Sequence, residues 1–202
     1  MEVFKYGEAE TDYLKKRDKK LAAAIERIGK IERKVMPDIF CALVSSIVSQ
    51  QISNKAAATV WNRLFQLSGG MTAENINGLS TESIQKCGMS MRKADYIKGI
   101  ASAVARGELD LNRLTQLPDD EIIDVLTKLK GIGVWTAEML LIFSLQRPNV
   151  LSFDDLGIKR GLCILHGHKS KSIDRITFNK YKDRYSPYCS VASLYLWAVS
   201  SE

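Results

Sequence analysis

Apolar residues recur at helical spacing along almost the whole chain. In residues 21–28, 40–48 and 60–65 they fall three or four positions apart, as Phe40, Leu43 and Ile47 do. This spacing places them on one face of a helix. We find no convincing alternation of apolar and polar residues of the kind a half-buried strand needs. The 202 residues therefore predict an irregular all-α fold of about ten short helices.

Capping chemistry gives two of the helix boundaries. Ser90 stands directly before an apolar-periodic segment, and Gly107 follows it. A serine hydroxyl satisfies first-turn amides and glycine ends a helix, so we expect a helix over residues 91–106. Pro118 followed by three acids predicts a second helix start, because acids interact favourably with the positive helix end.

The charge balance is mildly basic, with 29 Lys and Arg against 23 Asp and Glu, and a net charge of +6. Such a balance suits a polyanionic partner but is weak evidence alone. The basic stretch at residues 15–20 is more simply the solvated face of a helix than a DNA contact. No apolar run approaches the roughly 20 residues that a membrane helix needs, and residues 1–5 lack the apolar core of a secretory signal. We therefore expect a cytoplasmic protein.

The cysteines are far apart and form no pair with metal-ligand spacing; they are Cys41, Cys87, Cys163 and Cys189. A zinc site or an iron–sulfur cluster needs such pairs. We therefore expect reduced thiols that pack as small apolar residues, and no iron–sulfur cluster.

The most informative segment, residues 122–142, is typical of a helix, a tight turn and a second helix. Gly131 and Gly133 permit backbone conformations that other residues rarely adopt. They also have no side chain that would keep a phosphate at a distance from the backbone. The amides of Gly131, Gly133 and Val134 would lie at the start of the second helix, where unpaired N–H groups favour an anion. On the Gly-x-Gly tripeptide alone, an ordinary turn between helices would be the simpler interpretation.

In context, Leu-x-Gly-Ile-Gly-x-x-Thr-Ala at residues 129–137 resembles the helix-hairpin-helix motif of DNA-binding proteins. The resemblance implies phosphate binding and a structural Na⁺ or K⁺ at the hairpin. The carbonyls that would hold this ion belong to Thr127, Leu129 and Gly131. Lys130 stands where the family often has proline, a change that should soften the turn and keep the amides.

A second segment, residues 150–160, contains Asp-x-x-Ile-x-Arg and resembles the aspartate segment of the helix-hairpin-helix DNA glycosylases. The resemblance places Asp155 on the catalytic aspartate. Phe153 replaces a proline often found two residues earlier. We expect Asp154, which stands between Phe153 and Asp155, to cap the following helix.

Residues 43–53 and 185–197 are similar to the 3-methyladenine DNA glycosylase II branch. The first segment would supply the wedge that enters the duplex, at Gln51 with Gln50 beside it. The base pocket would have aromatic walls, for which the candidates are Trp135, Tyr185 and Tyr188. Cys189 departs from an arginine common at that position.

The implied reaction explains these residue types. Breaking a purine C1′–N9 bond leaves a cationic, oxocarbenium-like sugar, which a buried carboxylate stabilises mainly in the transition state. The base must first leave the stack, at a cost of a few kcal/mol offset by a wedge and aromatic surfaces. Alkylation makes a purine cationic, which favours electron-rich rings.

The resemblance implies two helical lobes, residues 38–145 and residues 1–37 with 146–202, and a DNA-binding and base-binding cleft between them. It implies a monofunctional glycosylase that acts on double-stranded DNA containing damaged bases, as a monomer without a required cofactor. The lesion range, from 3-methyladenine alone to 7-methylguanine, hypoxanthine and ethenoadenine, stays open.

Two alternatives remain. A bifunctional glycosylase and lyase would need a lysine two residues after the second hairpin glycine, where Trp135 stands and cannot form an imine. A non-catalytic DNA-binding module would use the hairpin alone. Such a module has no need of an aspartate at position 155 with aromatic segments around it.

Overall fold

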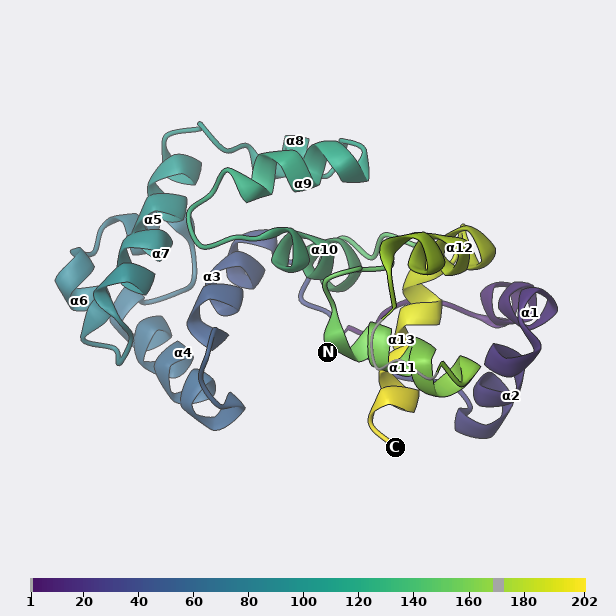
Figure 1. The fold of residues 1–202 in the computed structure, drawn as a ribbon. Helices are drawn as coiled ribbons and strands as arrows, with labels where there is room; N and C mark the ends of the chain where they lie inside the picture. The colour runs from purple at the N-terminus through teal and green to yellow at the C-terminus, as the bar shows by residue number, and fades with distance from the viewer. Residues whose placement is uncertain (1, 169–172) are drawn as a thin grey trace. The chain divides into compact units, whose positions relative to one another are not determined.

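The computed structural model describes residues 2–168 and 173–202, and it contains α-helices and one isolated bridge between Val3 and Lys34 in this part of the chain (Figure 1). The all-α prediction is confirmed. The helices are α1 (Glu8–Arg17), α2 (Lys19–Ile28), α3 (Ile39–Ser49), α4 (Asn54–Ser68), α5 (Ala73–Asn77), α6 (Thr81–Gln85), α7 (Met91–Ala105), α8 (Leu111–Leu114), α9 (Asp119–Thr127), α10 (Val134–Phe143), α11 (Leu156–His166), α12 (Arg175–Tyr185) and α13 (Cys189–Ser200).

The capping predictions hold at both predicted helix starts. Ser90 is the N-cap of α7 and its hydroxyl accepts the Lys93 amide, while three acids occupy the first turn of α9. The structure has more helices than expected because α5, α6 and α8 are only four or five residues long. Segments this short cannot show a helical period.

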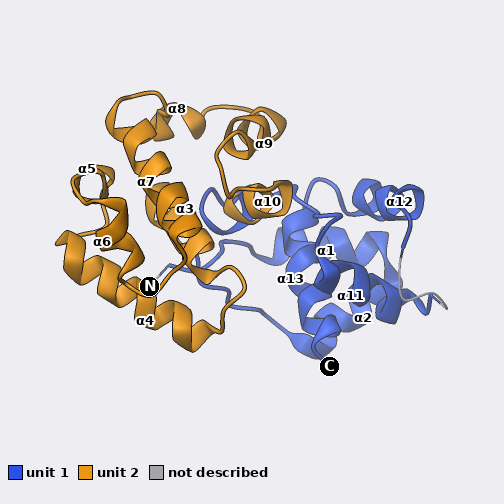
Figure 2. Ribbon diagram, turned by 60° about the vertical axis from the view of Figure 1, so that its left-hand side comes forward, with its two compact units in different colours: residues 1–35, 141–202 blue, residues 36–140 orange. Residues whose placement is uncertain are grey.

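Contacts divide the chain into two compact units, coloured separately in Figure 2. Unit 1 comprises residues 1–35 and 141–202, and unit 2 comprises residues 36–140. No helix in the described ranges is long and apolar enough to span a membrane.

Unit 2 packs around α3 and α7. Helix α3 contacts α4 and α7, while α5 and α6 lie against α7. Fully buried aliphatic side chains fill the space between these helices; they include Leu43, Ile47, Leu64, Ile76, Ile84 and Ile97. Burying each such side chain stabilises the fold by about 1.5–3 kcal/mol. This packing holds in place the helices that support the hairpin.

Unit 1 is built on the close packing of α11 against α13, with α2 also against α13. Gly161 makes this approach possible, because a Cβ at this position would overlap the backbone of Leu196. The largest fully buried side chains of the unit include Phe178, Tyr185 and Tyr195. The start and the end of the chain therefore share one core.

A buried polar cluster lies inside unit 1 around Asp18, the N-cap of α2. Its carboxylate accepts the amides of Lys20 and Leu21, the Arg184 guanidinium at 3.0 Å and the Tyr185 hydroxyl at 3.0 Å. The His166 Nε2 lies 3.4 Å away. Burial alone would raise the pKa of Asp18, but the Leu21 amide and Arg184 hold it below its ordinary value.

Candidate functional site

The predicted hairpin is present as α9, a turn at residues 128–133, and α10. The Gly133 carbonyl accepts the Ala137 amide at 3.0 Å, so the helical hydrogen bonds of α10 begin at Gly133. The first amides of a helix have no acceptor within it, and Gly133 and Val134 are both exposed. The amides of Gly133 and Val134 therefore belong to an exposed helix start, and their binding of a phosphate stays a prediction.

The two hairpin glycines have different structural requirements. Gly131 has a φ of 91°, and a Cβ on it would overlap the ring of Tyr96 on α7. Gly133 has open space around its Cβ position. Gly131 is thus required for the turn to pack against α7, whereas Gly133 leaves room for an approaching ligand.

Gln50, which sequence analysis placed beside the wedge, is joined to the hairpin within unit 2. Its Nε2 donates to the Gly131 carbonyl at 2.9 Å. The Leu129 carbonyl accepts the Ile132 amide at 3.1 Å. Two of the three carbonyls expected to hold a cation therefore already accept one hydrogen bond each.

Gln51 is exposed and has a φ of 56°, which a residue with a side chain seldom adopts. Lys93 of α7 holds this turn in place, because its Nζ donates to the carbonyls of Val48 at 2.9 Å and Gln50 at 2.6 Å. These contacts satisfy carbonyls at the end of α3. Burial lowers the pKa of the Lys93 ammonium.

In unit 1, Asp155 is 7% exposed and immediately precedes α11. The expectation that Asp154 caps this helix is wrong: Asp155 is the N-cap, and its Oδ1 accepts the Ile158 amide at 2.8 Å. The helix begins at Leu156, one residue later than the capping argument assumed, and Asp154 is exposed. A single side chain therefore combines the cap with the candidate catalytic carboxylate.

Trp197 of α13 provides a second donor to the same oxygen. Its Nε1 lies 2.9 Å from Asp155 Oδ1. Gly157 makes room for the indole, because a Cβ there would lie 2.8 Å from Trp197 Cδ1. Two N–H donors, one from α11 and one from α13, thus hold the Asp155 carboxylate in one orientation.

The segment before Asp155 is fixed to α13 by two buried serines. The Ser190 hydroxyl accepts the Val150 amide at 3.0 Å, and the Ser193 hydroxyl donates to the Val150 carbonyl at 3.1 Å. Without these partners, the buried N–H and C=O groups of Val150 would be unpaired and would destabilise the fold. The position of Asp155 is therefore set by α13 on both sides of the aspartate.

The three predicted pocket aromatics differ in exposure. Trp135 lies in the first turn of α10 and is 46% exposed. Tyr188 is half-buried and its ring packs edge-on against Tyr13 at 5.2 Å. Tyr185 has no exposed surface, and its hydroxyl is bonded to Asp18. In this structure Tyr185 belongs to the packed interior of unit 1.

Cys189 is fully buried at the start of α13, and its thiol donates to the Lys182 carbonyl at 3.3 Å. Burial raises the pKa of this thiol to about 12, so it stays neutral. Its role here is packing, as expected for the cysteines of this chain.

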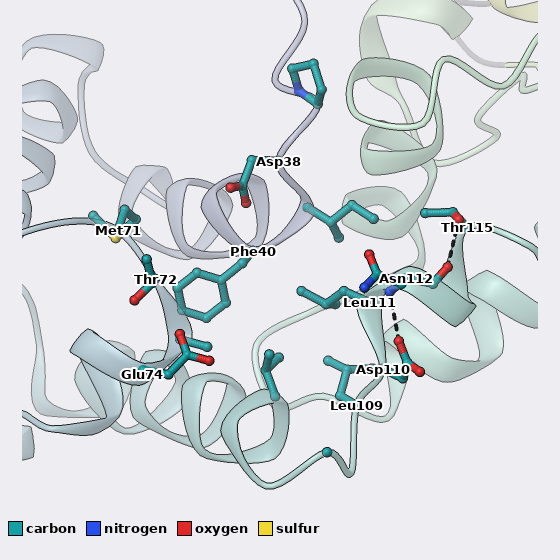
Figure 3. A pocket seen from close by; sticks show the side chains of 15 residues that line it. Asp38, Phe40, Met71, Thr72, Glu74, Leu109, Asp110, Leu111, Asn112 and Thr115 are labelled. Carbon is teal, nitrogen blue, oxygen red and sulfur yellow. Dashed lines mark hydrogen bonds between the residues drawn. The ribbon is translucent and has the colours of Figure 1, made fainter.

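A separate pocket of about 630 Å³ lies in unit 2, at the start of α3 and around α8 (Figure 3). Three carboxylates line it, those of Asp38, Glu74 and Asp110, and none of its fifteen lining residues is basic. Asp38 and Asp110 accept first-turn amides of α3 and α8. The negative charge is unsuitable for a phosphate, and no predicted site residue lines this pocket.

Residues 44–187 match the model of one family, described as the HhH-GPD superfamily of base excision DNA repair proteins. The chain belongs to this superfamily. The matched range contains Gln50 and Gln51, the hairpin and the Asp155 segment, which the residue patterns had indicated.

Relatives of this HhH-GPD protein include DNA-3-methyladenine glycosylase 1 of Schizosaccharomyces pombe, 38% identical over 162 residues that cover 78% of this chain and 71% of the relative. Among solved structures, a DNA-3-methyladenine glycosidase from Bacillus halodurans superposes with a TM-score of 0.88 and 37% identity, covering 99% of this chain and 93% of that one. A 3-methyladenine DNA glycosylase of Schizosaccharomyces pombe in complex with abasic DNA gives a TM-score of 0.81 and 32% identity, with 96% and 97% covered.

Sequence reasoning missed three supporting residues of this HhH-GPD chain: Trp197, Lys93 and Tyr96. Trp197 ended a segment already assigned to the pocket region, but nothing in the sequence connects it to Asp155. The contact joins residues 42 positions apart. Lys93 and Tyr96 lie on α7 in the ordinary pattern of an amphipathic helix, which gives no sign of what they contact.

Proposed function

We propose that this protein is a monofunctional DNA N-glycosylase that removes alkylated purines from duplex DNA and leaves an abasic site. The observation that carries the proposal is the buried carboxylate of Asp155, held by the Trp197 indole N–H and the Ile158 amide in a chain of the HhH-GPD superfamily. A carboxylate in a fixed orientation stabilises a cationic sugar without reorganising during the reaction.

DNA is the proposed partner, and a homologous glycosylase has been solved with abasic DNA. The exposed amides of Gly133 and Val134 would bind a backbone phosphate, which positions the protein without reading sequence. Gln51, at the tip of the turn fixed by Lys93, would fill the space left by the extruded base.

The departing base would meet electron-rich aromatic surface. Trp135 of unit 2 and Tyr188 of unit 1 each expose part of the ring, and each by itself stays a candidate for contact with the base. A methylated purine is cationic and is attracted to such faces. The glycosylase II branch, the monomeric state and the cytoplasmic location stay predictions.

Thr127, Leu129 and Gly131 would hold a monovalent cation through their carbonyls. Each carbonyl oxygen has two lone pairs, so the hydrogen bonds at Leu129 and Gly131 leave one acceptor site on each. Such an ion would add positive charge beside the phosphate. No catalytic step depends on it.

The test uses duplexes that each carry one lesion: 3-methyladenine, 7-methylguanine, hypoxanthine or ethenoadenine. We expect release of free base and strand breaks only after alkali. Strand breaks without alkali, or a covalent complex trapped by borohydride, would indicate the lyase alternative. Binding to every duplex without release of any base would indicate a binding module.

A further inference from the structure

Phe153, two residues before Asp155, lies against two cationic side chains of unit 1. The Lys159 Nζ is 4.8 Å from the centre of its ring, and the Arg175 Cζ is 3.9 Å from it. Lys159 belongs to α11 and Arg175 is the first residue of α12. The ring is itself packed edge-on against buried Phe178 at 5.2 Å. We call Lys159 and Arg175, together with the ring that orients them, the Phe153 cation pair.

Some other cations of unit 1 have partners within the protein. Arg184 is paired with Asp18, Arg27 is paired with Glu202, and Lys20 donates to the His166 carbonyl. Among the described residues, neither Lys159 nor Arg175 is in an ion pair.

The nearby carboxylates are directed at helix amides. Asp155 accepts the Ile158 amide and Asp174 accepts the Thr177 amide, each as the N-cap of its helix. Lys159 lies in the first turn of α11 and Arg175 in the first turn of α12, where the helix dipole favours anions and disfavours additional positive charge. Two like charges on one ring also repel each other. The cation–π contacts with Phe153 offset part of this unfavourable energy. An anionic ligand between the two cations would offset the rest.

We propose that the Phe153 cation pair binds the backbone phosphate of DNA next to the nucleotide whose base is removed. A guanidinium held against a ring keeps its N–H edge available to phosphate oxygens, and the adjacent ammonium adds a second positive group. Arg175 is exposed and Lys159 is partly exposed, so both are accessible. Because Phe153 and Asp155 share one turn, a carboxylate acting at C1′ places a phosphate of that nucleotide near the cation pair. This inference rests on the proposed function.

The test is the salt dependence of duplex binding. Each neutralised phosphate contributes about 0.9 to the slope of log affinity against log salt concentration. The ligands are a duplex with one abasic-site analogue and its undamaged counterpart, measured over a series of KCl concentrations. We expect Lys159→Gln and Arg175→Gln each to reduce the slope by roughly 1 on the abasic duplex, and affinity at low salt to fall severalfold or more. On the undamaged duplex the slope should change little.

Lys180→Gln is the matched control, since it removes the same charge from an exposed position on α12. It should leave the slope near the parental value on both duplexes. Phe153→Leu keeps an apolar contact for Phe178 but removes the ring that orients the cations. We expect it to weaken binding to the abasic duplex several-fold while largely preserving the slope.

Parental slopes for both cation variants, or changes no larger than that of Lys180→Gln, would overturn the proposal. A lower thermal midpoint with unchanged slopes would also overturn it, by showing that the cations only stabilise the fold. Absence of base release by the parent enzyme is a separate result. It would refute the glycosylase proposal. A salt slope that falls in the Lys159 and Arg175 variants only on the abasic duplex would still support the phosphate contact.

Discussion

The indole N–H of Trp197 donates to the Asp155 carboxylate at 2.9 Å, and Gly157 provides the space that this contact needs. The relationship joins the start of α11 to α13. It gives the candidate catalytic group a fixed orientation that its N-cap bond alone would leave less defined.

Trp197→Phe should keep the aromatic packing and remove the hydrogen bond. A hydrogen bond to a charged group contributes about 1.5–3 kcal/mol, so we expect single-turnover excision to slow by roughly 10- to 100-fold. Affinity for undamaged duplex should be unchanged. Rapid-quench measurements of base release would check this, and an excision rate within a factor of two of the parent would contradict it.

The hairpin glycines should respond unequally to alanine. Gly131→Ala combines a positive φ with overlap of the Tyr96 ring, so it should lower the thermal midpoint by several degrees and weaken binding to every duplex. Gly133→Ala adds a methyl group in open space and should leave the midpoint nearly unchanged, although it reduces access to the amides. Equal midpoints for the two variants would refute the structural distinction.

Gln51→Ala should slow excision from paired sites more than from mismatched ones, because an unpaired base costs less to extrude. The exposed position of Gln51 on a turn held by Lys93 suits this role. Single-turnover rates on duplexes that differ only in the opposite base provide the comparison. The same loss in both contexts would mean that Gln51 does not replace the extruded base.

The buried cluster around Asp18 should make stability depend on pH. Burial lowers the pKa of the His166 imidazole, although the Asp18 carboxylate opposes this effect. The unfolded chain therefore binds a proton more readily than the folded protein, and this loss of stability begins as pH falls below about 6.5. For one proton the slope cannot exceed about 1.4 kcal/mol per pH unit.

Urea unfolding at pH 8, 6.5 and 5 would measure this dependence, with His166→Gln as the comparison. We expect the free energy of unfolding to fall less between pH 6.5 and 5 in the variant than in the parent. An identical fall in both would show that the His166 imidazole is not responsible.

The local features of this fold could be predicted from sequence, and the supporting contacts could not. The hairpin is contained in about twenty consecutive residues whose glycines and apolar period are visible directly. The Trp197 contact depends on how α11 and α13 pack, which Gly161 permits by a close approach to Leu196. The capping error at Asp154 arose from a shift of one residue, and helix ends are the least certain part of any such prediction.

In the proposed reaction, Asp155 supplies the catalytic carboxylate. Asp155→Asn retains an oxygen that can accept the Ile158 amide, so the variant should fold and bind damaged DNA. Exposed Asp154→Asn is the matched control, and its rate should stay within about tenfold of the parent. The decisive measurement is single-turnover excision from a duplex with one alkylated adenine. We expect Asp155→Asn to lose at least about 100-fold, or roughly 2.7 kcal/mol; near-parental excision by this variant would contradict the assignment.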